Sequence, residues 1–297
     1  DLGSMRPLLL YATPTLPLIL PVLLLLGGLA VRAGLAPFHL ATFPAVGSSG
    51  SPVGGGLVLG MAAFATGVVA IKFAAALITI PALFAPYLAV VSAVAMVGGG
   101  AAALAVRSPR ARLAYLASSQ LGWAAAGLVS HYRSGVAASL FLLGAFAVAA
   151  TSGPALLGRA ADGGDAALSG LGLLRPARAA GLALAMLSLA GAPPLAGFFG
   201  ELAVAASLAQ GGQWILLSLG TVGAILSLAA ALGTLRVLYI QAPLDEARRG
   251  AHAALPALSG FSSLGAVAFC IVIAGYGFMA NPIMGLADQG AEALGLR

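Results

Sequence analysis

Stretches of about 20 apolar residues recur along the whole chain, and each is long enough to cross the ~30 Å hydrocarbon core of a bilayer as a helix. In lipid, every backbone N–H and C=O group needs a partner inside the protein, so spanning segments of this kind fold as helices. The composition agrees, because 61% of the 297 residues are hydrophobic and 7% are charged, against roughly 25% charged residues in soluble domains. The sequence therefore predicts an all-α polytopic membrane helical bundle, with residues 1–297 forming a single membrane domain.

The pattern predicts about eight transmembrane helices, two of them broken. The segment 178–210 is too long for one straight crossing and contains Pro193 and Pro194. We interpret it as one helix broken inside the membrane, which is tolerated where the break lines a cavity. The first span ends in a similar way, with Pro37 after a Gly-Leu-Ala sequence. The predicted spans are 14–38, 55–82, 86–106, 112–130, 135–157, 178–210, 214–240 and 256–280.

The arginines between the spans support this number of crossings. With 178–210 as a single broken span, the arginine-bearing loops 107–112, 159–178 and 241–255 share one side of the membrane. The positive-inside rule makes that side cytoplasmic. Splitting 178–210 into two spans would move the last of these loops to the other side and weaken the bias. The net charge of +6 therefore reflects topology, and no nucleic-acid partner is expected.

Two ionisable residues fall inside apolar segments. Lys72 is the only lysine of the chain, and Glu201 is the only acidic residue within such a segment. A charge in hydrocarbon costs a few kcal/mol at least, so residues of this kind usually face a protein interior or a wet path. Arg32 lies close to the first break. We expect the three to mark a path for charge, although Arg32 could reach the interface, Glu201 could cap a helix terminus and Lys72 could be structural.

Further polar groups have open roles. His39, after the first break, could be a relay group or an interfacial residue. Gln120, like its neighbours Ser118 and Ser119, could form helix–helix hydrogen bonds. His131 lies in a predicted loop, as does the third histidine, and both are expected to be solvated. No dinucleotide fingerprint, phosphate-binding loop or ligand cluster occurs in the sequence, so no cofactor is expected in this chain.

Four motifs carry a family resemblance: GLAPFHL, RARLAYLASSQLGW, MLSLAGAPPLAGFFGE and, near the end of the seventh span, LRVLY. In order and spacing they resemble the antiporter-like, proton-translocating subunits of respiratory complex I. The most similar is subunit N of bacterial NADH–quinone oxidoreductase, whose mitochondrial counterpart is NADH dehydrogenase subunit 2. The resemblance covers residues 10–240 well and the last span loosely, and LSLAGAPPLAGFFG is its most specific part.

The resemblance implies part of an inverted-repeat, antiporter-like fold. Residues 1–82 would form the end of a first repeat, 86–240 a second repeat and 256–280 a final helix. It also implies that the N-terminal helices of the family are missing, so that this chain supplies roughly the seventh to the fourteenth helices.

The resemblance assigns roles to single residues. Arg32 stands where the family has a lysine in its first broken helix, and Lys72 lies about one turn from the next family lysine, which aligns with Val69. Glu201 stands where subunit N usually has lysine and subunit M has glutamate. Gln120 stands where subunit N often has histidine. An arginine keeps its proton at physiological pH, so Arg32 can bias a path but cannot relay a proton.

The implied function is that of a proton-translocating membrane subunit of NADH–quinone oxidoreductase, with quinone reduction in partner subunits. Its expected setting is multi-pass in the inner (plasma) membrane, among lipid, protons and other membrane-arm subunits. The route would run laterally from Lys72 to Glu201, with Arg32 tuning the field. Two alternatives stay open: a subunit of a multi-subunit cation/proton antiporter or membrane-bound hydrogenase, and a degenerate structural subunit. The sequence segment ATFPAVGSSGSP has lost the two carboxylates that the family carries after its PFH motif.

Overall fold

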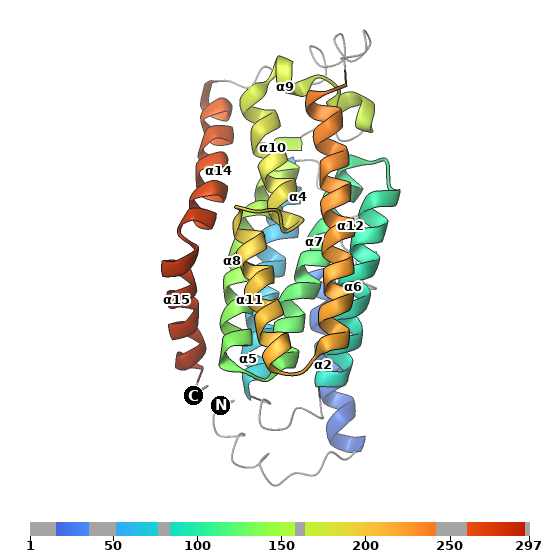
Figure 1. Cartoon of the computed structure of the whole chain (residues 1–297), viewed down its shortest axis with the longest axis vertical. Coiled ribbons are helices and arrows are strands. Elements are labelled where there is room, and N and C mark those ends of the chain that lie inside the picture. The colour runs from blue at the N-terminus through green and yellow to red at the C-terminus, as the bar shows by residue number, and fades with distance from the viewer. Residues whose placement is uncertain (1–15, 36–51, 77–83, 158–163, 242–259, 295–297) are drawn as a thin grey trace.

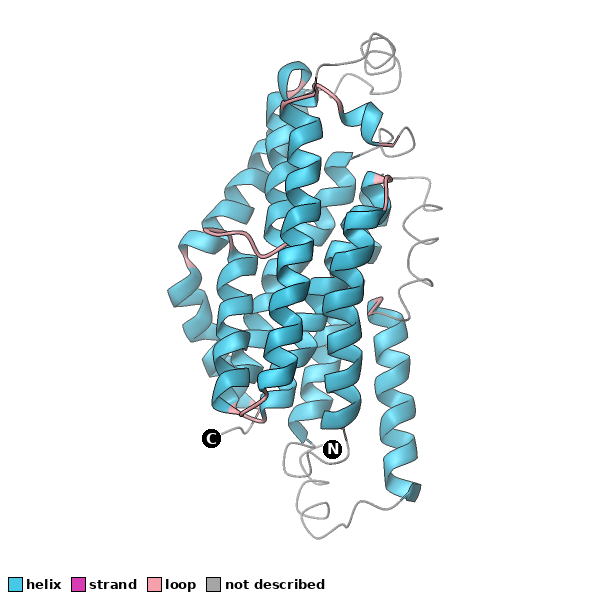
Figure 2. Ribbon diagram, turned by 45° about the vertical axis from the view of Figure 1, so that its right-hand side comes forward, coloured by secondary structure: helices cyan, strands magenta, loops and turns pink. Residues whose placement is uncertain are grey.

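The computed structural model describes residues 16–35, 52–76, 84–157, 164–241 and 260–294, and all regular structure within these ranges is helical (Figures 1 and 2). The long helices lie roughly parallel and form one bundle. The principal helices are α2 (Leu16–Ala33), α4 (Pro52–Leu57), α5 (Ala63–Ala76), α6 (Ala85–Ala105), α7 (Pro109–Gly127), α8 (Arg133–Leu157), α10 (Pro176–Leu189), α11 (Ala196–Gln210), α12 (Trp214–Tyr239), α14 (Gly260–Phe278) and α15 (Ala280–Ala293). Shorter elements are the π-helical η2 (Val58–Ala62), the 3-10 helices η4 (Leu128–Ser130) and η6 (Asp165–Leu168), and α9 (Leu171–Leu174).

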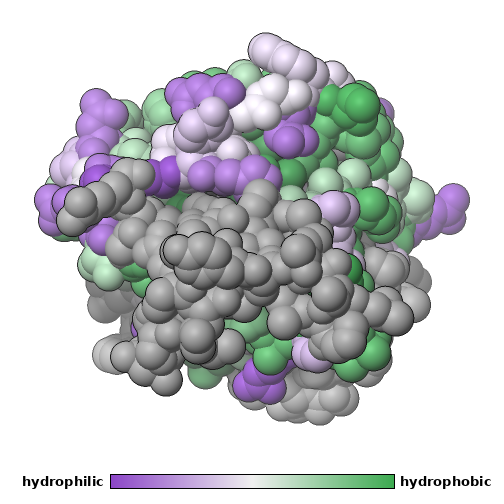
Figure 3. Space-filling view, turned by 90° about the horizontal axis from the view of Figure 1, so that it is seen from below, coloured by the Kyte–Doolittle hydropathy of each residue, from purple (hydrophilic) through white to green (hydrophobic). Residues whose placement is uncertain are grey.

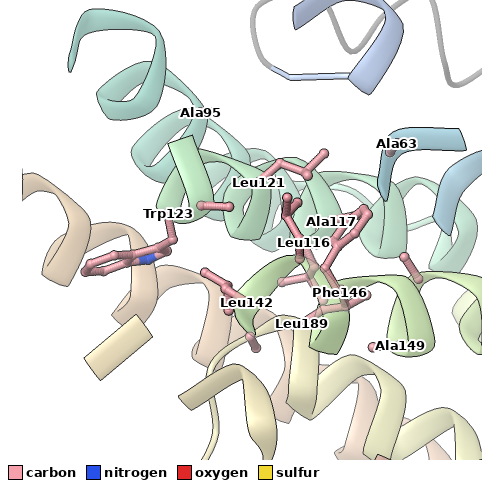
Figure 4. Packing of buried hydrophobic residues seen from close by; sticks show 14 of the residues in the cluster. Ala63, Ala95, Leu116, Ala117, Leu121, Trp123, Leu142, Phe146, Ala149 and Leu189 are labelled. Atoms are coloured by element: carbon pink, nitrogen blue, oxygen red, sulfur yellow. The ribbon is translucent and has the colours of Figure 1, made fainter. Parts of the chain in front are cut away.

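Helix α8 is the centre of the bundle. It contacts α4, α5, α7, α10, α11, α14 and α15. Of its most apolar 18-residue window, 72% is buried inside the chain, against 33% for α12 at one flank. Large side chains of α8 fill the space between its neighbours, and Phe146 lies among Leu116 of α7 and Leu189 of α10 (Figure 4). Seven helices therefore pack directly on α8, while α6 and α12 contact α7 and each other.

Small residues let several helices approach closely. A Cβ atom at Gly99 of α6 would lie 2.9 Å from the backbone nitrogen of Ser119 on α7, and one at Gly122 would lie 2.9 Å from the nitrogen of Met96. Lipid tails are as apolar as leucine, so helices in a membrane gain little from burial and associate through close packing of this kind.

The prediction of one broken crossing at 178–210 is confirmed. Helix α10 begins beside the end of α8, where the Arg178 guanidinium donates hydrogen bonds to the carbonyls of Leu156 and Leu157. Helix α11 ends at the opposite end of the bundle, where Gly211 packs against Ser130. The pair α10–α11 therefore crosses the bundle once, with the interruption at mid-height (Figure 2).

The predicted final span, 256–280, contains α14, but the sequence analysis did not predict the helix α15 that follows it. The chain bends by 74° between α14 and α15 and continues as a helix to Ala293. Asp288 and Glu292 lower the hydropathy of α15, so the hydropathy pattern did not predict this helix. In the structure they have a partner on α8, because Arg133 donates to Asp288 at 2.7 Å and to Glu292 at 3.1 Å.

Only the N-terminal side of the first predicted break lies within the described residues. Helix α2 ends at Ala33, and Gly34 follows with a φ of 76°, the left-handed conformation that often terminates a helix. Pro37, the predicted cause of the break, lies outside the described residues.

Each of the eight predicted segments contains a helix, but the segments differ in how they meet the requirements for a span. Within the described residues, four helices are long and apolar enough to cross a membrane, and the bent pair α14–α15 makes five if it is counted as one span. Helix α2 and helix α10 are apolar but shorter. Helix α7 is more polar and is buried along almost its whole length, so the protein itself shields it from lipid.

The described arginines divide between the two ends as the loop analysis predicts. Arg112 and Arg178 lie at one end and Arg133 at the other, while Arg248 and Arg249 lie outside the described residues. Viewed from the Arg133 end, hydrophilic side chains gather beside hydrophobic flanks (Figure 3). Arg112 donates to Asp165 at 2.8 Å and to Thr234 at 3.0 Å, and also to the carbonyls of Ala103 and Val106. It ties α6, α7, α12 and η6 together.

We expect Arg112→Ala to lower the stability of the protein by roughly 1–3 kcal/mol, because it leaves buried acceptors without their donor while Asp165 keeps partial solvent access. Arg107→Ala, which removes an exposed arginine at the same end, is the control and should change stability by less than about 0.5 kcal/mol. Thermal denaturation in detergent micelles measures both. Equal shifts for the two variants would contradict the role of Arg112.

Candidate functional site at the break between α10 and α11

The break between α10 and α11 is a compact turn inside the bundle. Residues 190–195 join the two helices at mid-height (Figure 1). Gly191 adopts a φ of 68°, a conformation that favours glycine, and the amide of Ala192 donates back to the carbonyl of Leu187 at 2.9 Å. The C-terminal end of α10 and the N-terminal end of α11 therefore both face the same small volume. Their dipoles place partial negative and partial positive charge there.

The carboxyl group of Glu201 reaches back to this turn. Glu201 lies in the second turn of α11 and is 8% exposed. A Cβ atom at Gly191 would lie 2.5 Å from the carboxyl carbon of Glu201, so the carboxyl group rests directly on this glycine. None of the hydrogen bonds or ion pairs within the described ranges involves this carboxyl group. Glu201 is thus a buried titratable group without a protein partner in the described part of the chain.

Gln120 joins the break from α7. Its Nε2 donates to the carbonyl of Ser188 at 2.9 Å, one of the last carbonyls of α10. Its Oε1 is buried and has no partner among the described residues. A Cβ atom at Gly197 would lie 2.6 Å from Nε2, so glycine at this position leaves room for the amide. The expectation of a helix–helix hydrogen bond for Gln120 is confirmed.

Two neighbouring serines, Ser119 and Ser227, have a structural role. Ser119 donates to the carbonyl of Met96 on α6 at 3.1 Å, and Ser227 of α12 donates to Ser119 at 3.1 Å. These bonds join three helices and leave no donor for the break.

The structure does not bring the two basic residues to this site. Lys72 is exposed on α5, on the same face as Val69, and Arg32 is exposed in the last turn of α2. Helix α5 and helix α11 pack on different sides of α8. His39 lies outside the described residues. The predicted site residues therefore separate into a buried pair, Glu201 and Gln120, and an exposed pair, Lys72 and Arg32.

The expectation that His131 is solvated is wrong. His131 is half-buried, its ring packs edge-on against Phe84 with centroids 6.1 Å apart, and its Nδ1 is buried with no partner among the described residues. Burial lowers the pKa of His131. The sequence places His131 in a loop, but it does not show that Phe84 packs against the imidazole ring.

The sequence analysis missed two contributors to the site, because neither contributes through a polar or ionisable side chain. Gly191 contacts the carboxyl group of Glu201 because it has no side chain, and Ser188 contributes its backbone carbonyl rather than its hydroxyl. The only signal for either was the Gly-Ala-Pro-Pro sequence, which marks a turn without showing which atoms face inward.

Comparison with known proteins gives the family. A family model described as NADH:quinone oxidoreductase/Mrp antiporter, transmembrane, matches residues 8–227. The chain belongs to this family. It is 30% identical over 315 residues to NADH-quinone oxidoreductase subunit N of Granulibacter bethesdensis, which covers 99% of this chain and 62% of the relative. It is 34% identical to the subunit N of Geobacter metallireducens, which covers 89% of this chain and 56% of the relative.

Solved structures agree with the fold. A chain of respiratory complex I from Thermus thermophilus with bound aureothin superposes with a TM-score of 0.72 at 28% identity, which covers 93% of this chain and 61% of that chain. A chain of the Mrp complex from Dietzia sp. has a TM-score of 0.77 at 20% identity, which covers 90% of this chain and 57% of that chain. This family member is therefore a multi-pass membrane protein with the antiporter-like fold. It spans less than two thirds of the length of these relatives.

We expect Gly191→Ala to destabilise the protein more than Gly212→Ala. Both glycines have similar left-handed backbones, with φ of 68° and 67°, so an alanine costs about 1 kcal/mol of backbone energy at either position. Only at Gly191 does the new methyl group overlap Glu201, since Gly212 has open space, and overpacking adds about 1–3 kcal/mol.

A double-mutant cycle measures the overlap by thermal denaturation. In a Glu201→Ala background, Gly191→Ala should cost no more than Gly212→Ala, because the carboxyl group is gone. If the extra cost of Gly191→Ala persists there, the carboxyl group does not rest on Gly191.

Proposed function

We propose that this chain conducts protons as a membrane subunit of an NADH–quinone oxidoreductase, in the plasma membrane of a bacterium. Family membership and relatives named as subunit N support this proposal. The observation that carries it is the buried carboxyl group of Glu201 at the helix break. Other membrane-arm subunits would be its partners, and redox cofactors would reside in them and not in this chain.

The environment of Glu201 suits a proton carrier. An ionised carboxylate without a partner in a water-poor interior is costly, so Glu201 is held neutral or is solvated by water when it is charged. The break supplies both conditions. The α11 N-terminus favours the charged form, and the unpaired Oε1 of Gln120 can accept a hydrogen bond from a water molecule beside it. A group whose two protonation states are both accommodated can take up and release a proton.

Lys72 is proposed as the second titratable group of the same route. It occupies an exposed face of a helix that is otherwise apolar enough to span a membrane. A charge on such a face needs a polar neighbour or a path to the interface. In the complete complex we expect polar groups of other segments to cover it and to extend the route, with Arg32 contributing a fixed positive charge.

A second function is favoured by one specific observation. The superposition on a chain of an Mrp complex shows that the same fold occurs outside complex I. A subunit of a multi-subunit cation/proton antiporter would carry the same break. Affinity purification of the tagged subunit from mild detergent separates the two: co-purification of NADH-oxidising, quinone-reducing subunits supports the oxidoreductase, and their absence with other membrane subunits present supports the antiporter.

We expect Glu201→Gln to abolish proton translocation through this subunit while the complex still assembles, because the amide keeps size and hydrogen bonding and loses only the titration. Glu201→Lys should be better tolerated, since it restores a titratable group of the type found in subunit N. Quenching of a pH-sensitive dye in inverted membrane vesicles, started with NADH, measures translocation.

Glu292→Gln is the matched control, because it makes the same chemical change at an exposed position of α15. It should pump like the parent. Parent-like pumping by Glu201→Gln would show that Glu201 is a helix-terminus cap and that the route leaves the subunit elsewhere.

We expect Lys72→Ala to reduce proton translocation strongly with normal assembly, and Lys72→Arg to reduce it as well, because arginine does not release its proton at physiological pH. Val69→Ala, one turn away on the same exposed face, should leave translocation unchanged. The same vesicle assay applies. Normal pumping by Lys72→Ala would exclude Lys72 from the route and leave it a structural or interfacial role.

A further inference from the structure

The bend between α14 and α15 lies against the break between α10 and α11. Gly277, in the last turn of α14, is buried, and a Cβ atom at this position would lie 2.7 Å from the carbonyl oxygen of Pro194 and 3.0 Å from the backbone nitrogen of Ala196. Both of these atoms belong to the backbone, so a larger residue at 277 would have to push the two segments apart. The two interruptions therefore lie at the same height of the bundle and in direct contact (Figure 1).

Apolar contacts continue on both sides of Gly277. Ile273, one turn earlier in α14, belongs to one buried cluster with Leu195, the last residue of the break. Ala280, the first residue of α15, belongs to a second buried cluster with Ala196, the first residue of α11. The C-terminal helix pair therefore covers the point at which α11 begins.

The opposite face of the helix pair is exposed, since Ile271 and Phe278 are 66% and 80% exposed. The pair thus lies between the break and the surroundings of the bundle. In lipid, a broken helix is tolerated only where its free backbone groups are shielded. Pro193 and Pro194, the exposed residues of the break, carry no N–H group. Ala196 carries one of the amides that a helix N-terminus leaves without an intrahelical partner, and this amide lies under the bend.

Sequence and polar contacts hold the bend in place. Pro282, in the first turn of α15, has no N–H group to donate to the last turn of α14, so the helix does not continue straight. Tyr276 of α14 donates to the carbonyl of Phe141 on α8 at 3.2 Å. Arg133 of α8 forms an ion pair with Asp288 of α15 at 2.7 Å. Both helices of the bent pair are therefore attached to the helix at the centre of the bundle.

We propose that the bend between α14 and α15 seals the α10–α11 break on its outer side, with Gly277 as the contact point, so that Glu201 exchanges protons only through the interior of the bundle. This proposal rests on the proposed function and concerns how the same site is insulated. The carboxyl group of Glu201 rests on Gly191, within the same short turn that the bend covers at its other end. An opening at Gly277 would give solvent a second way to this turn and to the carboxyl group.

Modification of Glu201 by dicyclohexylcarbodiimide tests the seal in membrane vesicles that contain the complete complex. This reagent is lipid-soluble and reacts with protonated carboxyl groups in apolar surroundings. Mass spectrometry of the subunit measures the rate, with Glu201→Gln as the blank. We expect slow modification in the parent and a rate several-fold higher in Gly277→Val, because the valine forces the bend away from the break. Gly277→Ala should give an intermediate rate.

Gly275→Val is the matched control, because it makes the same change in the same helix at a glycine whose Cβ atom would meet nothing within 4 Å. It should be modified like the parent. Equal rates in Gly277→Val and Gly275→Val would overturn the seal. If Gly277→Val does not assemble, Gly277→Ala against Gly275→Ala makes the same comparison. Failure of the proposed function is distinguishable, because then Glu201→Gln would pump like the parent while the modification rates would still separate the two glycine positions.

Discussion

The structure depends on the need of backbone N–H and C=O groups for partners in an environment without water. Helices meet this need by themselves, so most of the chain folds as uninterrupted apolar helices around α8. Among the described residues, a longer interruption lies at 190–195, where the chain leaves the helical conformation and resumes it inside the bundle. The carbonyl of Ser188 is satisfied there by Gln120, a side chain from another helix. The break is therefore a site that the rest of the bundle must complete, and this explains why polar groups of α7 and α11 meet at it.

Charge is distributed over the molecule in two ways. Arg112, Arg133 and Arg178 lie at the ends of the bundle and bind carboxylates or terminal carbonyls, so their charge stabilises the fold. Glu201 and Lys72 have no such partner among the described residues. The described part of the fold thus supplies partners for these three arginines and none for Glu201 or Lys72. This contrast between bound arginines and unbound titratable groups agrees with the proposed roles of Glu201 and Lys72 in proton transfer.

Features that depend on period, composition and residue type could be predicted from the sequence. Glu201 and Gln120 could be found because an ionisable or polar side chain inside an apolar run is visible in one dimension. The single broken crossing at 178–210 could be predicted because it places the arginine-bearing loops on the same side of the membrane. The contact between Gly191 and Glu201 could not, since it depends on a left-handed turn folding back on α11. Helix α15 was missed because its acidic residues find their partner Arg133 some 155 residues earlier in the chain.

The break also presents partial charges of both signs to the side chain at position 201. The last carbonyls of α10 carry partial negative charge and the first amides of α11 carry partial positive charge, and both face the same volume. A carboxyl group is favoured by the amides and a lysine by the carbonyls, so either charge finds a complementary terminus within reach. The Nε2 of Gln120 and the backbone amide of Gly191 both donate to the carbonyl of Ser188, so part of the negative end of α10 is already satisfied in this chain.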